Sequence, residues 1–143
     1  MSDTKQTLID NLNRDLAHEY QAVIMYNTYS AAVLGPHRNQ LRTFFREEVP
    51  DELRHAEYLS DKIVSLGGTP TTRASEVPVA ADAHSMLENV KKAESETIDR
   101  YVERRKEAEA FGDFALVNDL EEMISDETGH MEECGKILQG YHD

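Results

Sequence analysis

The chain has a single cysteine, Cys134, so it can form no internal disulfide and contains no CxxC metal or redox motif. It has no apolar run near the roughly 18 residues that a membrane span requires. Its first ten residues, MSDTKQTLID, lack a signal-peptide core. Basic residues are few, with 15 Lys and Arg against 28 Asp and Glu and a formal net charge of −13. We therefore expect a cytoplasmic protein that binds neither nucleic acid nor anionic membranes by simple electrostatics.

Hydrophobic residues recur at intervals of three and four over most of the chain, which is the period of an amphipathic helix. Three glycine-containing turns interrupt this pattern. They are Gly35-Pro36, Gly67-Gly68 and Gly112-Asp113. Residues 67–82 are expected to form an extended connection that ends at Asp82, a suitable helix N-cap. The sequence thus predicts four helices, at about 4–34, 38–66, 83–111 and 113–139.

The lengths of the connections predict how these helices are arranged. A chain of 143 residues is expected to fold as one domain, residues 1–143, whose core needs no disulfide or structural zinc. Short turns join the first helix to the second and the third to the fourth, so each pair is expected to be an antiparallel hairpin. At up to about 3.3 Å per residue, the connection at 67–82 can run the length of the bundle. We therefore predict an all-α four-helix bundle of two antiparallel hairpins joined by a long crossover.

Two Glu-x-x-His pairs are the first sign of a functional site. They are Glu52/His55 and Glu127/His130, and on a helix this spacing places the carboxylate and the imidazole on one face. One such pair arises easily by chance in a chain rich in glutamate. Each pair, however, has a partner 33 residues upstream, Glu19 for Glu52 and Glu94 for Glu127. The midpoint of each interval falls at or beside a predicted turn. Because the rise per residue is constant, each hairpin sets a lone glutamate level with a Glu-x-x-His pair.

These glutamates also lie on the apolar faces of their helices. Glu19 falls midway between Leu12 and Tyr26 at steps of seven, and Glu94 has the same place in the third helix. Glu96, in contrast, shares its face with polar residues and is expected to face water. Burying four carboxylates without cations is very costly, whereas two divalent cations cancel four negative charges and two imidazoles complete the coordination. The candidate metal ligands are Glu19, Glu52, His55, Glu94, Glu127 and His130.

The pattern resembles the ferritin-like superfamily, and within it bacterioferritin and the short, Dps-like bacterioferritin-type proteins. The sequence DETGH at 126–130 is similar to DEEGH in bacterioferritins, and the resemblance covers nearly the whole chain. It implies a ferritin-like bundle that holds two iron ions per subunit, with manganese or zinc as alternatives. In such a site Glu52 and Glu127 would bridge both metals. Glu19 with His55 and Glu94 with His130 would complete the two coordination spheres.

Two departures from bacterioferritin bear on cofactor and assembly. The methionine that ligates haem in that family is replaced by Leu53, so we expect no haem bound by that route. The chain ends about ten residues after the last metal motif, before the family's short fifth helix. We expect a homo-oligomer built from dimers. A cage of 12 or 24 subunits is left open, and the missing helix favours a smaller, Dps-like cage over the usual 24-subunit shell.

Four further residues near the candidate ligands have alternative interpretations, and a fifth has one. Asp51 and Asp126 precede ligand glutamates and either accept the outer ring N–H of a ligating histidine or are ordinary surface acids. Tyr26, which matches a tyrosine near the metals in such proteins, and Tyr101 either contact a ligand or donate an electron, or they fill the core. Cys134 is expected to be a small buried residue.

The remaining histidines and acidic pairs are expected to be ordinary surface or core residues, although the acidic pairs alternatively attract iron. The histidines are His18, His37, His84 and His142. The acidic pairs are Glu47-Glu48, Glu121-Glu122 and Glu132-Glu133.

The favoured hypothesis for function is a ferroxidase that oxidises Fe(II) with dioxygen or peroxide, for iron storage or detoxification. One alternative is a ferritin-like di-iron oxidase or peroxidase acting on a substrate other than iron. Another is a bundle that binds metal without catalysis.

Overall fold

The computed structural model describes residues 3–141, and within this range all regular structure is helical. It consists of α1 (Asp3–Ala32), α2 (Arg38–Ser65), α3 (Ala83–Phe111) and α4 (Phe114–Gln139). The all-α prediction is confirmed. None of the helices in these residues is long and apolar enough to cross a lipid bilayer.

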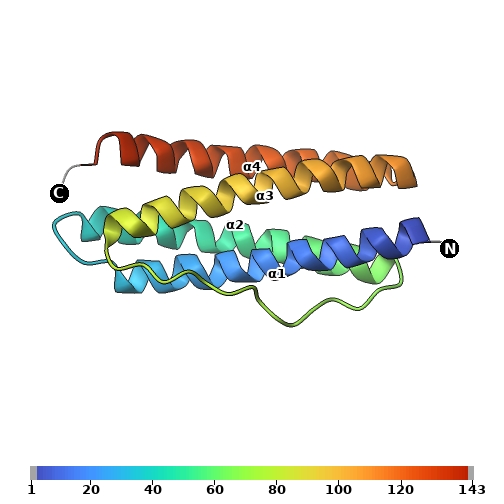
Figure 1. The fold of residues 1–143 in the computed structure, drawn as a ribbon, viewed down its shortest axis with the longest axis horizontal. Coiled ribbons are helices and arrows are strands. Elements are labelled where there is room, and N and C mark those ends of the chain that lie inside the picture. Colours follow the sequence, from blue (N-terminus) through green and yellow to red (C-terminus); the bar gives the residue numbers. More distant parts are fainter. Residues whose placement is uncertain (1–2, 142–143) are drawn as a thin grey trace.

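The helices form the two predicted hairpins. α1 packs along α2, α3 packs along α4, and the hairpins also meet through α1 and α3. Figure 1 shows that the segment after α2 returns along the whole bundle beside α1, so that α3 begins near the end where α2 began. α2 and α3 therefore run in the same direction, which distinguishes this topology from an up-down-up-down bundle.

The first hairpin differs slightly from its predicted helix bounds. The helix predicted at 4–34 ends two residues early, because the chain turns through Gly35, whose φ of 108° favours glycine. The helix predicted at 38–66 ends one residue early, with Leu66 as its C-cap. The Leu66 N–H still donates to the Lys62 carbonyl, so the last turn is closed.

Aspartate side chains begin both helices of the second hairpin. Asp82 is the N-cap of α3, as predicted, and accepts a hydrogen bond of 2.8 Å from the Ser85 N–H. Asp113 caps α4 by accepting 3.0 Å from the Leu116 N–H, so this helix begins one residue later than predicted. The side chain of Asp113 also contacts Lys62 Nζ at 2.8 Å, which ties the start of α4 to the end of α2.

Replacing Asp113 with alanine is expected to destabilise the fold by about 1–2 kcal/mol, since it removes the cap of α4. Urea unfolding followed by circular dichroism measures this change. Asp113→Asn is the matched control, because asparagine caps as well as aspartate but cannot pair with Lys62 as a charge. A stability loss as large in Asp113→Asn as in Asp113→Ala would contradict the capping role.

The core is divided into two apolar clusters along the bundle axis. The first cluster lies at the end that holds the start of α1, and includes Leu8, Leu12, Leu59, Leu116 and Leu120. The second cluster lies at the opposite end, and includes Met25, Val33, Leu41, Phe45 and Leu87. On every helix, the segment between these two clusters carries a buried glutamate, and on α2 and α4 it also carries a histidine.

The crossover after α2 is held against α1 by hydrogen bonds. The Ser75 N–H donates to the Ala17 carbonyl at 3.0 Å, and the Tyr29 hydroxyl donates to the Pro78 carbonyl at 2.7 Å. Gln21 Nε2 donates to the Glu76 carbonyl at 2.5 Å. These contacts explain how an extended segment without regular structure keeps a defined path along the bundle.

Candidate metal centre

The structure brings the six predicted ligands together midway along the bundle. They form two groups whose candidate ligand atoms lie within 4.8 Å of one another. One group is Glu19, Glu52, His55 and Glu127, and the other is Glu52, Glu94, Glu127 and His130. Glu52 and Glu127 belong to both groups, so the two sets of ligands adjoin and share two carboxylates.

These side chains are buried without the partners that buried polar groups need. The four glutamates are at most 2% exposed. Among the described residues, seven buried polar atoms of the six side chains have no hydrogen-bond partner. They are Glu19 Oε2, both carboxylate oxygens of Glu52, His55 Nδ1, Glu94 Oε2, Glu127 Oε1 and His130 Nδ1. Unsatisfied carboxylate oxygens and imidazole nitrogens facing one another are the donor set of a divalent metal, so the residues fit such ions.

Each histidine turns one ring nitrogen into the site and the other outward. His55 Nδ1 lies 3.1 Å from Glu127 Oε1 and 3.7 Å from Glu19 Oε1. On the outer side, His55 Nε2 lies 3.1 Å from Asp126 Oδ2. An unprotonated Nδ1 is free to bind metal, and Nε2 then carries the hydrogen and donates it to Asp126.

His130 is arranged in the same way, with one addition. Its Nδ1 lies 3.3 Å from Glu52 Oε1, and its Nε2 lies 3.3 Å from Asp51 Oδ2. A second carboxylate oxygen, Glu48 Oε2, lies 2.5 Å from the same Nε2. Of the two interpretations of the aspartates, the contacts therefore support the one in which they hold the ligand histidines. Each aspartate contacts the histidine of the other hairpin.

Two tyrosines close the site at its two ends. The Tyr26 hydroxyl, from α1, donates to Glu94 Oε1 on α3 at 2.5 Å. The Tyr101 hydroxyl, from α3, donates to Glu19 Oε1 on α1. Both rings are fully buried, with Tyr101 in the first apolar cluster and Tyr26 in the second. Each tyrosine therefore both fills the core and contacts a predicted ligand.

The site repeats itself along the chain. Its members in the first hairpin have identical residues 75 positions later in the second. The pairs are Glu19/Glu94, Tyr26/Tyr101, Asp51/Asp126, Glu52/Glu127 and His55/His130. Glu48 departs from this repeat, since Met123 stands 75 positions after it.

Burial and mutual repulsion control the charges of the site. Burial raises the pKa of Glu52 well above its usual value, and the charges of Glu19 and Glu127 raise it further. Burial likewise raises the pKa of Glu94, with the charge of Glu127 adding to the effect. Burial opposes ionisation of Glu127 too, but the adjacent Glu94 carboxyl and His55 imidazole lower its pKa to about 2.

Both histidines favour the protonated form. Burial disfavours the imidazolium of His55, but the adjacent carboxylates of Glu127 and Glu19 raise its pKa to about 11. His130 shows the same balance, with Glu48 and Glu127 raising its pKa above the usual value. In the absence of metal, shared protons thus take the place of cations among the carboxylates.

Metal loading near pH 7 is expected to release protons. His55, with a pKa of about 11, must lose a proton to bind a cation near pH 7, whereas Glu127 with its pKa of about 2 has none to lose. The raised pKa values of Glu52 and Glu94 act in the same direction as that of His55. Calorimetric titration with Zn(II), repeated in buffers of different ionisation enthalpy, counts the protons released. A binding enthalpy that does not depend on the buffer would contradict the prediction.

Sequence reasoning missed two features around the site. For Glu48 the sequence left open whether it attracts iron or faces water, and did not predict its contact with His130, although Glu48 lies four residues before Glu52 on the same helix face. Asp15, four residues before Glu19, is buried with Arg104 of α3, whose Nε donates to Asp15 Oδ2 at 2.6 Å. Burial raises the pKa of Asp15 to about 6 against the opposing effect of Arg104. This ion pair joins α1 to α3 one turn from the site.

The other candidates within residues 3–141 lie outside the site. Cys134 is fully buried and donates to the Leu87 carbonyl at 3.1 Å, as expected of a small core residue. His18 lies 3.1 Å from Gln21 Oε1, and His84 Nδ1 lies 3.1 Å from Glu88. The ring of His37 contacts that of Tyr141, and His142 lies outside the described residues. Glu121 and Glu133 form surface ion pairs with Arg105 and Lys136.

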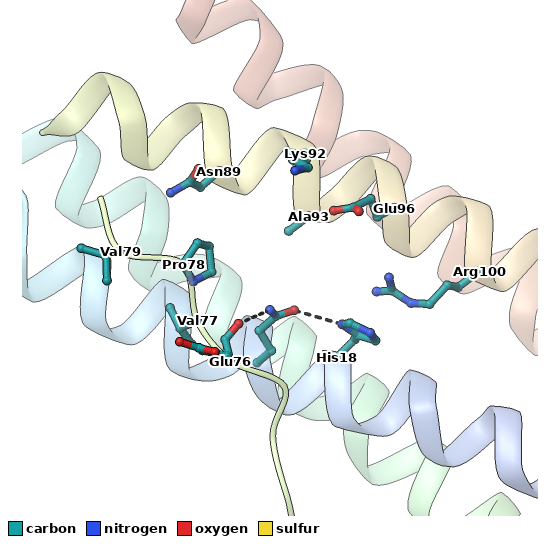
Figure 2. Close-up of a pocket in the computed structure, with 11 residues that line it drawn as sticks. His18, Glu76, Val77, Pro78, Val79, Asn89, Lys92, Ala93, Glu96 and Arg100 are labelled. Carbon is teal, nitrogen blue, oxygen red and sulfur yellow. Dashed lines mark hydrogen bonds between the residues drawn. The ribbon is translucent and has the colours of Figure 1, made fainter. Parts of the chain in front are cut away.

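A separate cavity of about 330 Å³ lies between α1, α3 and the crossover. Figure 2 shows Glu96 and Arg100 of α3 facing His18 of α1 at one end, and Val77, Pro78 and Val79 of the crossover at the other. None of the six predicted ligands lines it. The cavity is therefore distinct from the candidate metal centre.

The fold and the cluster of four glutamates and two histidines are those expected of one class of protein, the four-helix bundles that bind two metal ions through carboxylates between their helices. The family model for the ferritin-like domain matches residues 9–141. The chain belongs to the ferritin-like family, and the resemblance predicted from the sequence is confirmed.

Sequence relatives place the chain near bacterioferritins. It is 32% identical to the bacterioferritin of Streptomyces coelicolor over 128 residues, which cover 87% of this chain and 75% of that protein. It is 28% identical to the bacterioferritin of Desulfovibrio desulfuricans over 130 residues, which cover 90% of this chain and 73% of that protein.

The chain is also similar to two proteins of solved structure. A ferritin-like, diiron-carboxylate protein from Bacillus anthracis is 48% identical, with a TM-score of 0.95 and coverage of 96% of this chain and 99% of that one. The Desulfovibrio desulfuricans bacterioferritin, solved with its diiron site in different catalytic states, is 26% identical with a TM-score of 0.86. This match covers 96% of this chain and 81% of that one.

Proposed function

We propose that this chain is a ferroxidase, which oxidises Fe(II) at a di-iron centre formed by the six clustered side chains. The observation that carries the proposal is the pair of ligand groups that share Glu52 and Glu127. Two adjoining groups with two common carboxylates suit a pair of iron ions held side by side. The similarity to a diiron-carboxylate protein and to bacterioferritins supports iron over other divalent metals.

The six residues would divide between the two ions as follows. Glu52 and Glu127 would bridge both ions, because they belong to both groups. Glu19 and His55 would complete one position, and Glu94 and His130 the other. Four carboxylates balance the charge of two Fe(II) ions, and the unpartnered oxygens and Nδ1 atoms gain the partners that they lack.

The protein would promote oxidation by stabilising the product. Fe(II) would be the substrate: two ions would each give up one electron, and these two electrons, with two protons from water, would reduce one dioxygen to hydrogen peroxide. The resulting Fe(III) ions carry more charge, so anionic oxygen ligands in a buried site stabilise them more than Fe(II). Asp126 and Asp51 keep the imidazoles oriented, since each contacts the outer nitrogen of one histidine.

Stopped-flow oxidation of iron tests the proposal. Metal-free protein is mixed anaerobically with increasing Fe(II) and then with dissolved dioxygen, and the ferric absorbance and oxygen uptake are recorded. The expected result is a fast phase whose amplitude stops growing at two Fe(II) per subunit. Oxidation no faster than in buffer alone would contradict the proposal.

We also propose that the chain assembles into a dimer-based homo-oligomer, up to a cage of 12 or 24 copies. The similarity to bacterioferritins supports this proposal. Leu53 stands at the position of the haem-ligating methionine of bacterioferritins, and its side chain has no atom that can bind haem iron. Light scattering measures the mass of the assembly and so separates two functions. A cage favours iron storage, whereas a monomer or dimer favours oxidation of a substrate other than iron.

A further inference from the structure

Glu48 makes the two halves of the candidate metal centre unequal. In the 75-residue repeat, every ligand and both aspartates have an identical counterpart, but Glu48 corresponds to Met123. Met123 is buried in the first apolar cluster. One histidine therefore has a neighbouring carboxylate that the other lacks.

The contacts of the two histidines show the consequence. The outer nitrogen of His130 lies 2.5 Å from a Glu48 oxygen and 3.3 Å from an Asp51 oxygen. The outer nitrogen of His55 lies 3.1 Å from an oxygen of Asp126, and no other carboxylate contact to this nitrogen occurs in residues 3–141. Glu48 is also better shielded from water, since its side chain is 15% exposed and that of Asp126 is 52% exposed.

A carboxylate on the outer N–H of a ligand histidine acts on the metal through the ring. It fixes the orientation of the imidazole and makes the inner nitrogen a stronger donor. Its negative charge also attracts the cation directly, and this attraction is stronger where little water screens it. Asp51 and Asp126 supply the first effect to both histidines, since each is hydrogen-bonded to one outer ring nitrogen. Glu48 adds a further negative charge beside His130 alone, so the second effect favours the position that His130 serves over the position that His55 serves.

We propose that Glu48 is a positioning residue that makes the two metal positions unequal, with the Glu94/His130 position binding a divalent cation more tightly than the Glu19/His55 position. The inference rests on the metal centre of the proposed function. It extends that function by predicting which metal position fills first. The six ligands alone predict no such order, because they are equivalent in the two halves of the site.

Single-position variants allow each half to be measured alone. His55→Ala leaves the Glu94/His130 position, and His130→Ala leaves the Glu19/His55 position. Anaerobic titration of each variant with Co(II), followed by its visible absorption, gives one dissociation constant per position. The expected dissociation constant is smaller in His55→Ala than in His130→Ala.

Adding Glu48→Met to each variant tests the cause. In the His55→Ala protein, this change is expected to weaken Co(II) binding about 10-fold or more, the usual effect of losing an outer partner of a ligand histidine. In the His130→Ala protein, the same change is expected to alter binding less than about twofold, since Glu48 contacts the histidine that is already absent. Glu48→Gln, which keeps an acceptor but not the charge, is expected to have an intermediate effect and remains available if Glu48→Met does not fold.

Glu47→Met is the matched control, because Glu47 is the exposed neighbour of Glu48 on the same helix. It is expected to leave both dissociation constants unchanged. Equal affinities at the two positions, no cobalt binding, or equal weakening by Glu48→Met in both proteins would overturn the inference. Because cobalt binding involves no oxidation, a protein with unequal cobalt sites and no activity towards Fe(II) would refute the ferroxidase alone.

Discussion

Replacing Glu127 with alanine is expected to lower the initial rate of Fe(II) oxidation by at least about 100-fold. Glu127 belongs to both ligand groups, so its loss removes an oxygen donor from both metal positions. Losing even an outer partner of a metal ligand commonly costs about 10- to 100-fold in affinity or activity, and a shared ligand should matter more. Glu52→Ala is expected to have the same effect, since Glu52 is the other shared residue. Stopped-flow ferric absorbance at two Fe(II) per subunit measures the rate.

The chain contains two matched controls for this experiment. Glu57 and Glu132 each lie five residues after a shared glutamate, on the same helices, and both are exposed. Alanine at either position changes the net charge by the same amount without touching the site. Both control variants should oxidise iron within about twofold of the parent. A Glu127→Ala variant that is as fast as the controls would show that oxidation occurs elsewhere on the protein.

Metal loading is expected to raise the melting temperature by about 10–20 °C over protein treated with a chelator. A ligand present at 100 times its dissociation constant adds about 2.7 kcal/mol to stability, and two ions add about twice that. For a chain of this size, each kcal/mol raises the melting temperature by about 2–4 °C or slightly more. Differential scanning calorimetry with Zn(II) or anaerobic Fe(II) measures the change. No shift in the parent, or the same shift in Glu127→Ala, would contradict binding at this site.

The metal-free protein is expected to become less stable as the pH rises from about 6 to 9. The folded chain raises the pKa of Glu52 and Glu94 above 4.5, so folding retains protons that the unfolded chain releases, and stability falls as pH rises. His55 acts in the same direction. Its contribution is complete below 6.5 and is lost as the pH approaches its folded value of about 11. Melting temperatures of chelated protein across this range test the sign. A melting temperature that rises with pH would contradict it.

The sequence alone predicted the helices and the clustering of the six candidate ligands, because both follow from regular spacing. Hydrophobic residues at three- and four-residue intervals reveal a helix wherever it packs on a core. A hairpin with a short turn fixes which residues lie level, so the 33-residue intervals to Glu52 and Glu127 placed four glutamates at one height. The bounds that were wrong lie at caps such as Asp113, where one side-chain hydrogen bond decides where the helix begins.

Contacts between the two hairpins were less predictable. The spacing within one hairpin says nothing about which residue of the other hairpin it meets. Asp51 reaches His130 and Asp126 reaches His55 because the hairpins pack face to face, and a single sequence does not contain that register. The contact of Glu48 was not predicted for the same reason, since its partner lies on α4. Asp15 and Arg104 likewise pair across the two hairpins.

Crystals of the iron-loaded protein, measured at the iron absorption edge, test the central claim most directly. The predicted anomalous map has two peaks in the middle of each subunit, both in contact with Glu52 and Glu127. One peak adjoins Nδ1 of His55, and the other adjoins Nδ1 of His130. An anomalous map whose peaks lie only on surface carboxylates, with none between the four helices, would contradict the claim that these six side chains form a di-iron centre.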